Sequence, residues 1–290
     1  MAQLVWFVTG STRGFGRALV TAALEAGDAV AATARRPEQL SDLKAEYGDR
    51  IVPIAVDVTD AGAVRSALQA ARDYFGRIDV VVNNAGYANL APVEIADEQD
   101  FRTQFETNFW GVYNVSKAAI PLLRDGGGGT IIQFSSVGGR VGGSAGLGSY
   151  QAAKFAVDGL SRVLATETEA FGIRILVVEP SGFATDWSGS SMAVADIPPE
   201  YETSLGERLR FMRTSDLLRA GDPVRAAGIL IRIVRRQHLP THLLLGAYAV
   251  TSALDYTRKQ HAEAEEWAGV SRSADFIEPY PVEFPEDAAP

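Results

Sequence analysis

Short apolar runs alternate with longer segments of helical period along most of this 290-residue chain. Six of these runs have the length and composition of buried strands, and they cover residues 4–9, 29–33, 51–56, 80–82, 130–134 and 173–178. Each run is apolar on both faces and is separated from the next by a length suited to a helix, which is typical of βαβ units with right-handed crossovers. A seventh strand is predicted at residues 242–245, after a helix that begins at Asp222 and Pro223. The pattern predicts an α/β fold, a doubly wound parallel sheet of about seven strands with helices on both faces.

Two regions break the alternation. Residues 183–220 lack a regular strand period, and we expect them to form a partly helical substrate lid. Residues 248–290 are expected to form a C-terminal extension, a charged helical segment as far as Trp267 and then a tail rich in proline and glutamate. The sequence shows no internal repeat and no second core. Residues 1–290 are therefore expected to be one catalytic domain that includes the lid.

Composition excludes several kinds of site. The chain has no cysteine, and the spacing of His238, His242 and His261 suggests no metal pair on a helix face, so no disulfide, cysteine nucleophile or metal site is predicted. The formal charge of −9 disfavours nucleic acid as a partner. The first residues lack a basic region and no apolar run approaches about 20 residues, so we expect no signal peptide and no membrane partner. We accordingly expect a cytoplasmic protein.

A glycine-rich turn, TGSTRGFG at residues 9–16, follows the first predicted strand, and a helix is expected after it over residues 17–26. Glycines let the backbone turn tightly, and the free N–H groups at a helix N-terminus attract a phosphate. The position of the turn between a strand and a helix, at the start of a βαβ series, favours a dinucleotide site. The spacing is G-x-x-x-G-x-G rather than the G-x-G-x-x-G of most dinucleotide folds.

Two further motifs accompany this turn in register, NNAG at residues 83–86 and YxxxK from Tyr150 to Lys154. With these three motifs the chain resembles the short-chain dehydrogenase/reductase family in its non-extended form, over roughly the first 190 residues. The resemblance implies a Rossmann-type fold, a nicotinamide dinucleotide cofactor and hydride transfer between a carbonyl and an alcohol.

The resemblance implies that the end of the second strand reads the adenosine ribose of the cofactor. An acidic residue there would bind the 2′-hydroxyl of NAD and repel a 2′-phosphate. Here the strand has alanine at that place, Arg35 follows, and Arg13 lies inside the glycine turn. Two guanidiniums converging on a phosphate predict a preference for NADP(H). Arg36 is interpreted as a solvated residue at the entry to the next helix.

The family pattern also implies the remaining cofactor contacts. The glycine turn contributes Gly10, Ser11, Thr12, Arg13, Gly14, Phe15 and Gly16. Asp57 and Val58 would contact the adenine, although Asp57 could instead cap the next helix. After the fourth strand, Asn84, Ala85 and Gly86 would approach the ribose, and Asn83 is interpreted as structural. The carboxamide would be seated by Pro180, Gly182, Phe183 and Thr185, with Ser181 where the family usually has glycine.

Tyr150 and Lys154 are four residues apart on a segment of helical period, so they share one face. Lowering a tyrosine pKa from about 10 to about 7 requires roughly 4 kcal/mol of preference for the phenolate. The Lys154 ammonium and a positive nicotinamide ring would supply much of that preference. Ser136, at the end of the fifth predicted strand, would hold the substrate oxygen, and Ser135 should point the other way. The resemblance gives Asn108 the role of holding a water near the lysine and gives Tyr150 and Lys154 a second role in binding the cofactor.

These features predict an NADP(H)-dependent oxidoreductase that interconverts a carbonyl and an alcohol. Its small-molecule substrate is expected to be hydrophobic, because the lid contains Trp187, Met192, Tyr201, Phe211 and Met212. Two alternatives are a Tyr-Lys epimerase or dehydratase and an NADP(H)-sensing protein without catalysis. The resemblance implies a homodimer or homotetramer, paired through the helices that hold Asn108 and Tyr150.

Overall fold

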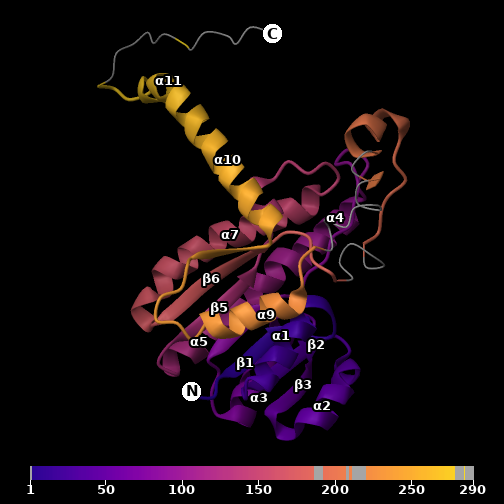
Figure 1. Cartoon of the computed structure of the whole chain (residues 1–290), viewed down its shortest axis with the longest axis vertical. Helices are drawn as coiled ribbons and strands as arrows, with labels where there is room; N and C mark the ends of the chain where they lie inside the picture. Colours follow the sequence, from indigo (N-terminus) through magenta and orange to yellow (C-terminus); the bar gives the residue numbers. More distant parts are fainter. Residues whose placement is uncertain (1, 186–191, 207–208, 211–219, 278–283, 285–290) are drawn as a thin grey trace.

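A computed structural model describes residues 2–185, 192–206, 209–210, 220–277 and 284 (Figure 1). Seven parallel strands form one sheet in the order β3-β2-β1-β4-β5-β6-β7. The strands are β1 (Val5–Thr9), β2 (Ala29–Ala34), β3 (Ile51–Ala55), β4 (Val80–Asn83), β5 (Gly129–Phe134), β6 (Ile173–Pro180) and β7 (His242–Leu245). All seven predicted strands are present, and the Rossmann-like architecture is confirmed.

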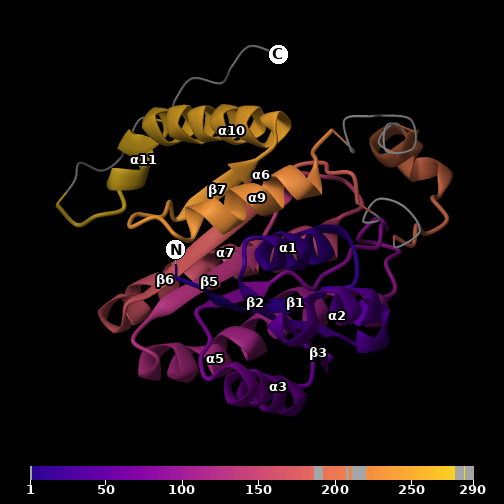
Figure 2. The ribbon, with the colours of Figure 1, turned by 60° about the horizontal axis from the view of Figure 1, so that its bottom comes forward.

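The strands place apolar side chains on both faces of the sheet, because successive side chains of a strand alternate. Trp6 and Val8 pack in a core with α1 (Gly14–Glu25), α2 (Ser41–Tyr47) and α9 (Pro223–Ile233). Phe7 between them packs in a second core with α3 (Ala61–Phe75), α5 (Gly111–Asp125) and α7 (Gly148–Thr168). Figure 2 shows α1 and α9 on one side of the sheet and α3 and α5 on the other. The helices therefore cover both faces, as predicted.

Shorter elements complete the parts of the fold that surround the sheet's carboxyl edge. α4 (Glu98–Phe105) continues through the π-helical turn η3 (Glu106–Trp110) into α5, and α6 (Gly138–Val141) lies between β5 and α7. The remaining short turns are η1 (Pro37–Leu40), η2 (Gly48–Arg50), η4 (Glu169–Phe171), η6 (Pro199–Tyr201) and η7 (Glu202–Gly206).

Several element boundaries differ from the prediction for local reasons. α1 begins at Gly14 rather than at residue 17, so the last glycines of the turn already form its first turn. β6 extends to Pro180, because Glu179 and Pro180 still pair with Leu244 and Leu245 of β7. The predicted cap of α9 is confirmed, since the Asp222 carboxylate accepts hydrogen bonds from the N–H groups of Val224 and Arg225.

The lid region contains η6 and η7 among the residues that the structure describes, whereas Trp187, Phe211 and Met212 lie outside the described residues. At the C-terminal end, α10 (Ala247–Glu266) and α11 (Ala268–Arg272) extend away from the sheet (Figure 1). The two buried residues of α10, Ala249 and Ala253, lie near its start. Within the described ranges, no helix has the length and apolar character needed to span a bilayer.

Candidate active site

A cavity of about 950 Å³ opens along the carboxyl ends of the strands. In doubly wound sheets this edge is the usual ligand site, because the strand order reverses there, here between β1 and β4. Eighteen of the predicted residues line it: Gly10, Thr12, Arg13, Gly14, Phe15, Arg35, Asp57, Val58, Asn84, Ala85, Gly86, Ser136, Tyr150, Lys154, Pro180, Gly182, Phe183 and Thr185. The topology thus brings together residues that are up to 175 positions apart, from Gly10 to Thr185.

The structure does not bring Ser11, Gly16 or Asn108 to the cavity wall. Ser11 is buried, and its hydroxyl donates to the Val8 carbonyl at 2.8 Å, which shapes the turn from within. A Cβ at Gly16 would lie 2.1 Å from the Gly10 carbonyl oxygen, so this position requires glycine for packing of the turn against α1. Both residues therefore act on the shape of the turn in this structure.

Two arginines stand at the end of the cavity formed by β1, β2 and β3. Arg13 precedes α1 and Arg35 follows β2, and both are exposed at the cavity wall. Neither forms an ion pair with an acidic side chain of the described ranges, which leaves their positive charges available to an anion. Arg36 does not line the cavity, in line with its interpretation as a solvated residue.

Asp57 does not cap the helix that follows it. Its Oδ1 accepts hydrogen bonds from the amide and the hydroxyl of Thr59, at 3.0 and 2.8 Å. The cap of α3 is Asp60, whose Oδ1 accepts from the N–H groups of Gly62 and Ala63. The alternative interpretation of Asp57 as a helix cap is therefore wrong, because the loop after β3 continues three residues further than the sequence suggested.

The amides after β4 hold the glycine turn in place. Asn84 Nδ2 donates to the carbonyls of Thr9 and Gly10, at 2.9 and 3.1 Å. The Thr9 hydroxyl in turn accepts from the backbone N–H groups of Asn84 and Ala85. Asn83 is buried and donates to Gln133 Oε1 at 2.8 Å, so it has the structural role expected of it. Thr9 belongs to the predicted glycine-rich turn without a predicted role of its own, and Gln133 carries no motif that could have marked it.

The tyrosine and lysine lie on one face of α7, both buried. Lys154 Nζ donates to the Phe134 carbonyl at 2.6 Å and lies 5.7 Å from the centre of the Tyr150 ring. Burial raises the pKa of Tyr150 to about 12, and a hydrogen bond with Ser136 opposes this rise. Burial also lowers the pKa of Lys154 to about 8. The protein groups by themselves therefore favour the protonated form of Tyr150, and the lowering of its pKa expected with a positive nicotinamide ring stays a prediction.

Ser136 and Ser135 point in different directions at the end of β5. The Ser136 hydroxyl accepts from the Gly138 amide at 3.0 Å and is hydrogen-bonded to Tyr150. The Ser135 hydroxyl is buried and donates to the Lys154 carbonyl at 3.2 Å, so it ties β5 to α7. The serine next to the tyrosine is the one that the alternation of side chains predicted.

Asn108 lies in η3, fully buried behind the cavity wall. Its side-chain Nδ2 donates to the carbonyls of Tyr87 and Gln104, both at 2.8 Å, and its Oδ1 accepts from the Tyr87 N–H. Gly86 separates it from the lysine: a Cβ at Gly86 would lie 2.5 Å from Asn108 Oδ1 and 3.6 Å from Lys154 Nζ. Asn108 is thus next to Lys154 across a glycine.

The tyrosine end of the cavity adjoins a buried apolar cluster. Tyr150 packs in a buried cluster with Ala88, Leu90, Leu147 and Leu205, and this cluster contacts Met192, Ile197, Tyr201 and Leu209 of the lid region. The segment predicted to be a lid is attached here by backbone hydrogen bonds, since the N–H of Leu90 donates to the carbonyl of Ala193 and the N–H of Ala195 donates to the carbonyl of Leu90. Of this cluster, Leu147 and Tyr150 line the cavity, and the other members do not.

The sequence model of the short chain dehydrogenase family matches residues 4–194 of the chain. The chain belongs to the short-chain dehydrogenase family. It is 46% identical over 268 residues to Oxidoreductase BOA17 of Botryotinia fuckeliana, covering 92% of this chain and 97% of that protein. It is also 32% identical over 248 residues to a 3-ketodihydrosphingosine reductase of Bacteroides thetaiotaomicron, covering 85% and 89%.

Solved structures agree with this assignment. A short-chain dehydrogenase from Streptomyces avermitilis superposes with a TM-score of 0.87 at 36% identity, over 94% of this chain and 99% of that one. As a short-chain dehydrogenase, the protein is an oxidoreductase of a family that uses NAD(P)(H). The residues around the cavity fit such a cofactor, with a glycine turn at a helix N-terminus, free arginines at one end and a buried tyrosine at the other.

Proposed function

We propose that this short-chain dehydrogenase is an NADP(H)-dependent enzyme that interconverts a carbonyl and an alcohol, with Tyr150 as acid and base. The observation that carries the proposal is the convergence of Ser136, Tyr150 and Lys154 on one end of a cavity whose other end presents Arg13 and Arg35. Ser136, Tyr150 and Lys154 are the groups that would hold and protonate a carbonyl oxygen during hydride transfer. The guanidiniums of Arg13 and Arg35 are suited to bind a 2′-phosphate.

A bound NADPH would supply the hydride at C4 of its nicotinamide ring. Ser136 would hold the carbonyl oxygen of the substrate by a hydrogen bond, and Tyr150 would donate its proton to that oxygen as negative charge develops. The high pKa of Tyr150 in the protein alone favours the protonated form that reduction requires. Oxidation would need a lower pKa, which the Lys154 ammonium and the charge of an oxidised nicotinamide would favour.

The remaining site residues are proposed to bind and orient. Lys154 would also contact the ribose, and Asn108, next to it across Gly86, would hold a water that relays a proton back toward Tyr150 after Tyr150 has given its own to the substrate. Asp57 and Val58 would face the adenine, and Pro180, Gly182, Phe183 and Thr185 the carboxamide. Gly14 lies against Thr185, since a Cβ at Gly14 would be 3.4 Å from the Thr185 Cβ, which favours one continuous cofactor cradle.

The substrate is proposed to be a hydrophobic ketone, aldehyde or secondary alcohol. Val141 and Leu147, which line the cavity with Tyr150, support this, and residues 183–220 would act as the lid of the substrate end. Residues 1–290 would form one domain with a C-terminal extension, in a cytoplasmic homodimer or homotetramer. The presence of both Tyr150 and Lys154 at one cavity disfavours a sensor without catalysis.

The test is turnover with NADPH and NADH against aromatic, aliphatic and steroid-like ketones. We expect reduction with NADPH, much weaker reduction with NADH, and the corresponding alcohol as product. Equal use of NADH would refute the role of the arginine pair while leaving the catalytic residues in place. Binding of NADPH without turnover of any ketone or alcohol in the panel would favour the sensor alternative.

A further inference from the structure

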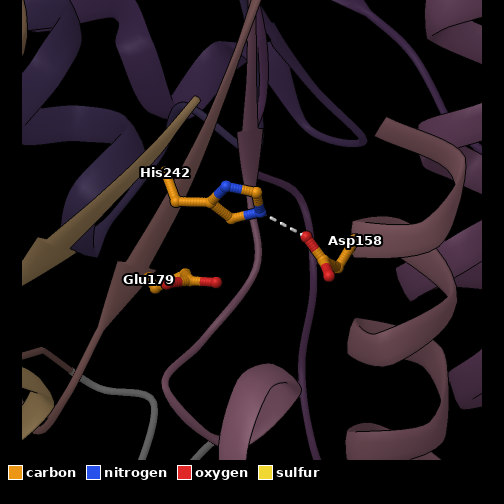
Figure 3. Close-up of side chains that lie close together, drawn as sticks. All are labelled: Asp158, Glu179 and His242. Atoms are coloured by element: carbon orange, nitrogen blue, oxygen red, sulfur yellow. Dashed lines mark hydrogen bonds and ion pairs between the residues drawn. The ribbon is translucent and has the colours of Figure 1, made fainter. Parts of the chain in front are cut away.

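Two carboxylates and a histidine lie together outside the cavity lining, where α7, β6 and β7 are neighbours. Asp158 comes from α7, one turn after Lys154, while Glu179 is at the end of β6 and His242 begins β7. Figure 3 shows the three side chains pointing toward one another, and their ligand-type atoms all lie within 4.8 Å. None of the three lines the cavity. The proposed reaction as described above uses none of them.

Two arginines neutralise the cluster from outside. Arg140 Nε donates to Glu179 Oε2 at 2.8 Å, and Arg162 Nε donates to Asp158 Oδ2 at 3.0 Å. His242 Nε2 is 2.5 Å from Asp158 Oδ1, and its Nδ1 is 3.1 Å from the Thr241 hydroxyl. Two carboxylates and two guanidiniums already balance. A divalent cation among the three acceptors would add two positive charges beside both arginines, so the charges favour a role that needs no metal.

Glu179 is the most buried member, with 1% of its surface exposed. Its Oε2 accepts from Arg140, and its Oε1 has no hydrogen-bond partner among the described residues. A buried carboxylate is unfavourable without a neighbouring cation, so Glu179 holds the Arg140 guanidinium in place. The Arg140 side chain is itself 25% exposed, so solvent partly screens the attraction between Arg140 and Glu179, and the ion pair still ties α6 to β6.

Arg140 belongs to α6, the short helix that follows Ser136. The Ser136 hydroxyl accepts from the Gly138 amide, and the Val137 amide donates to the Pro180 carbonyl at 3.0 Å. Gly139 fits tightly against α7, because a Cβ there would lie 2.7 Å from the Lys154 Cβ. The segment that carries Ser136 is therefore held between the end of β6 and the catalytic helix, with the ion pair at its far end.

We propose that Glu179 is a positioning residue for the reaction proposed above: through Arg140 it fixes α6 and thereby the direction of the Ser136 hydroxyl toward the substrate oxygen. This inference rests on the proposed function. Glu179 directly precedes Pro180, so the same residue links the oxygen-holding serine to the segment proposed to seat the carboxamide. The positions of the substrate oxygen and of the cofactor carboxamide would thus both depend on the end of β6.

The test is a kinetic cycle with Glu179→Gln, Ser136→Ala and the double variant, together with Arg140→Met. We expect Glu179→Gln and Arg140→Met to lower kcat for ketone reduction roughly 10- to 100-fold, as misplacement of an orienting group does, with the Kd of NADPH nearly unchanged. In the Ser136→Ala background the Glu179→Gln change should have little further effect, because the group that it positions is already absent. The control Glu98→Gln, which breaks the exposed pair with Arg102, should behave as the wild type.

If Glu179 serves only to stabilise the fold, the losses in kcat caused by Glu179→Gln and Ser136→Ala should be independent of each other. Glu179→Gln should then also lower the melting temperature and weaken NADPH binding. That result would overturn the proposal. Hydrogen–deuterium exchange gives a readout without turnover: amides 137–142 should exchange faster in Glu179→Gln than in the wild type, while those of β1 and β4 stay unchanged. A wild type that reduces no ketone would refute the proposed function, and the exchange result would still decide the position of α6.

The same proteins are measured after dialysis against EDTA and after addition of Zn²⁺. We expect the kcat of the wild type and the exchange of amides 137–142 to be the same in both conditions. Activity that requires Zn²⁺ and is lost together with bound Zn²⁺ in His242→Ala would overturn the proposal in favour of a metal site. His261→Ala is the matched control, since His261 pairs with Glu265 on an exposed helix face with no third ligand nearby among the described residues.

Discussion

Tyr150 lies where three influences on its proton compete. Burial favours the neutral phenol, the hydrogen bond with Ser136 favours the phenolate, and Lys154 lies near the ring. Burial has the larger effect and raises the pKa of Tyr150 to about 12, which favours the protonated form in the protein alone. This arrangement is suited to an acid that acts in reduction.

Replacing Tyr150 with phenylalanine removes the proton donor and leaves the ring in its apolar cluster. We expect kcat for ketone reduction to fall by roughly 10²- to 10⁴-fold, the range for loss of a general acid, while NADPH quenching or fluorescence titration gives an affinity close to that of the wild type. Retention of more than a tenth of the activity would mean that another group donates the proton.

Arg35 and Arg13 offer a second test at single residues. Removing either guanidinium by substitution with alanine should raise the KM for NADPH and leave the KM for NADH nearly the same. The preference for NADPH should fall roughly 10-fold per arginine, as expected for a charge-assisted hydrogen bond worth about 1.5 kcal/mol. Arg36→Ala is the matched control, because Arg36 is adjacent but does not line the cavity.

Lys154 makes the stability of the protein depend on pH. Its pKa is lowered from 10.5 to about 8 by burial, so its contribution to stability is complete above pH 10.5 and is lost as the pH falls toward 8. In Lys154→Met this loss is absent. Chemical denaturation of both proteins between pH 7 and pH 11 should show the free energy of unfolding of the wild type gaining about 3 kcal/mol on the variant as the pH rises. A constant difference across that range would show that the lysine is not desolvated.

At the scale of secondary structure, the strands were predictable because each is a short apolar run, and residues 242–245 were predicted without error. The ends of elements were less accessible. β6 continues through Glu179 and Pro180, two residues that do not look like a strand and remain in it through pairing with β7. The π-helical turn around Asn108 was not predicted either, and within it Asn108 bonds to the carbonyls of Tyr87 and Gln104.

Site residues that belong to a sequence motif could be predicted. Residues that come together only through the order of strands and helices could not. Tyr150 and Lys154 are recognisable from their spacing of four on a helix. Asp158, Glu179 and His242 are far apart in sequence, and they meet because α7, β6 and β7 are neighbours. Asn84 was expected to touch cofactor, and its hydrogen bonds to Thr9 and Gly10 give it a second task that no local pattern indicates.

The cap of α3 gives a prediction for one element. Asp60→Ala removes the acceptor for two amides at the start of the helix and should lower the free energy of unfolding by about 1 kcal/mol. Asp57→Ala, three residues earlier, should leave the unfolding free energy nearly unchanged, because its carboxylate bonds within the loop. Urea titration of the two variants and the wild type measures both. Equal destabilisation by the two substitutions would contradict the assignment of the cap to Asp60.

At the scale of the whole molecule, the outer surface near the active-site helices carries exposed apolar side chains. Trp110 on η3 and Val163 on α7 are 43% and 52% exposed, which supports the proposed pairing of copies through these elements. We expect Trp110→Glu combined with Val163→Glu to halve the mass measured by light scattering. Val224→Glu, on α9 and 64% exposed, is the matched control and should leave the mass unchanged. A wild type that is monomeric at working concentration would refute the pairing.

The strand order also has a consequence for recombination between related genes. The residues proposed to read the adenosine end, Arg13, Arg35 and Asp57, all come from the half of the sheet that is encoded first. Those proposed to act on the substrate, from Asn108 to Lys154, come from the half encoded later. A single genetic crossover between the codons for residues 58 and 84 would therefore exchange coenzyme choice between two related genes and leave each with its own substrate range.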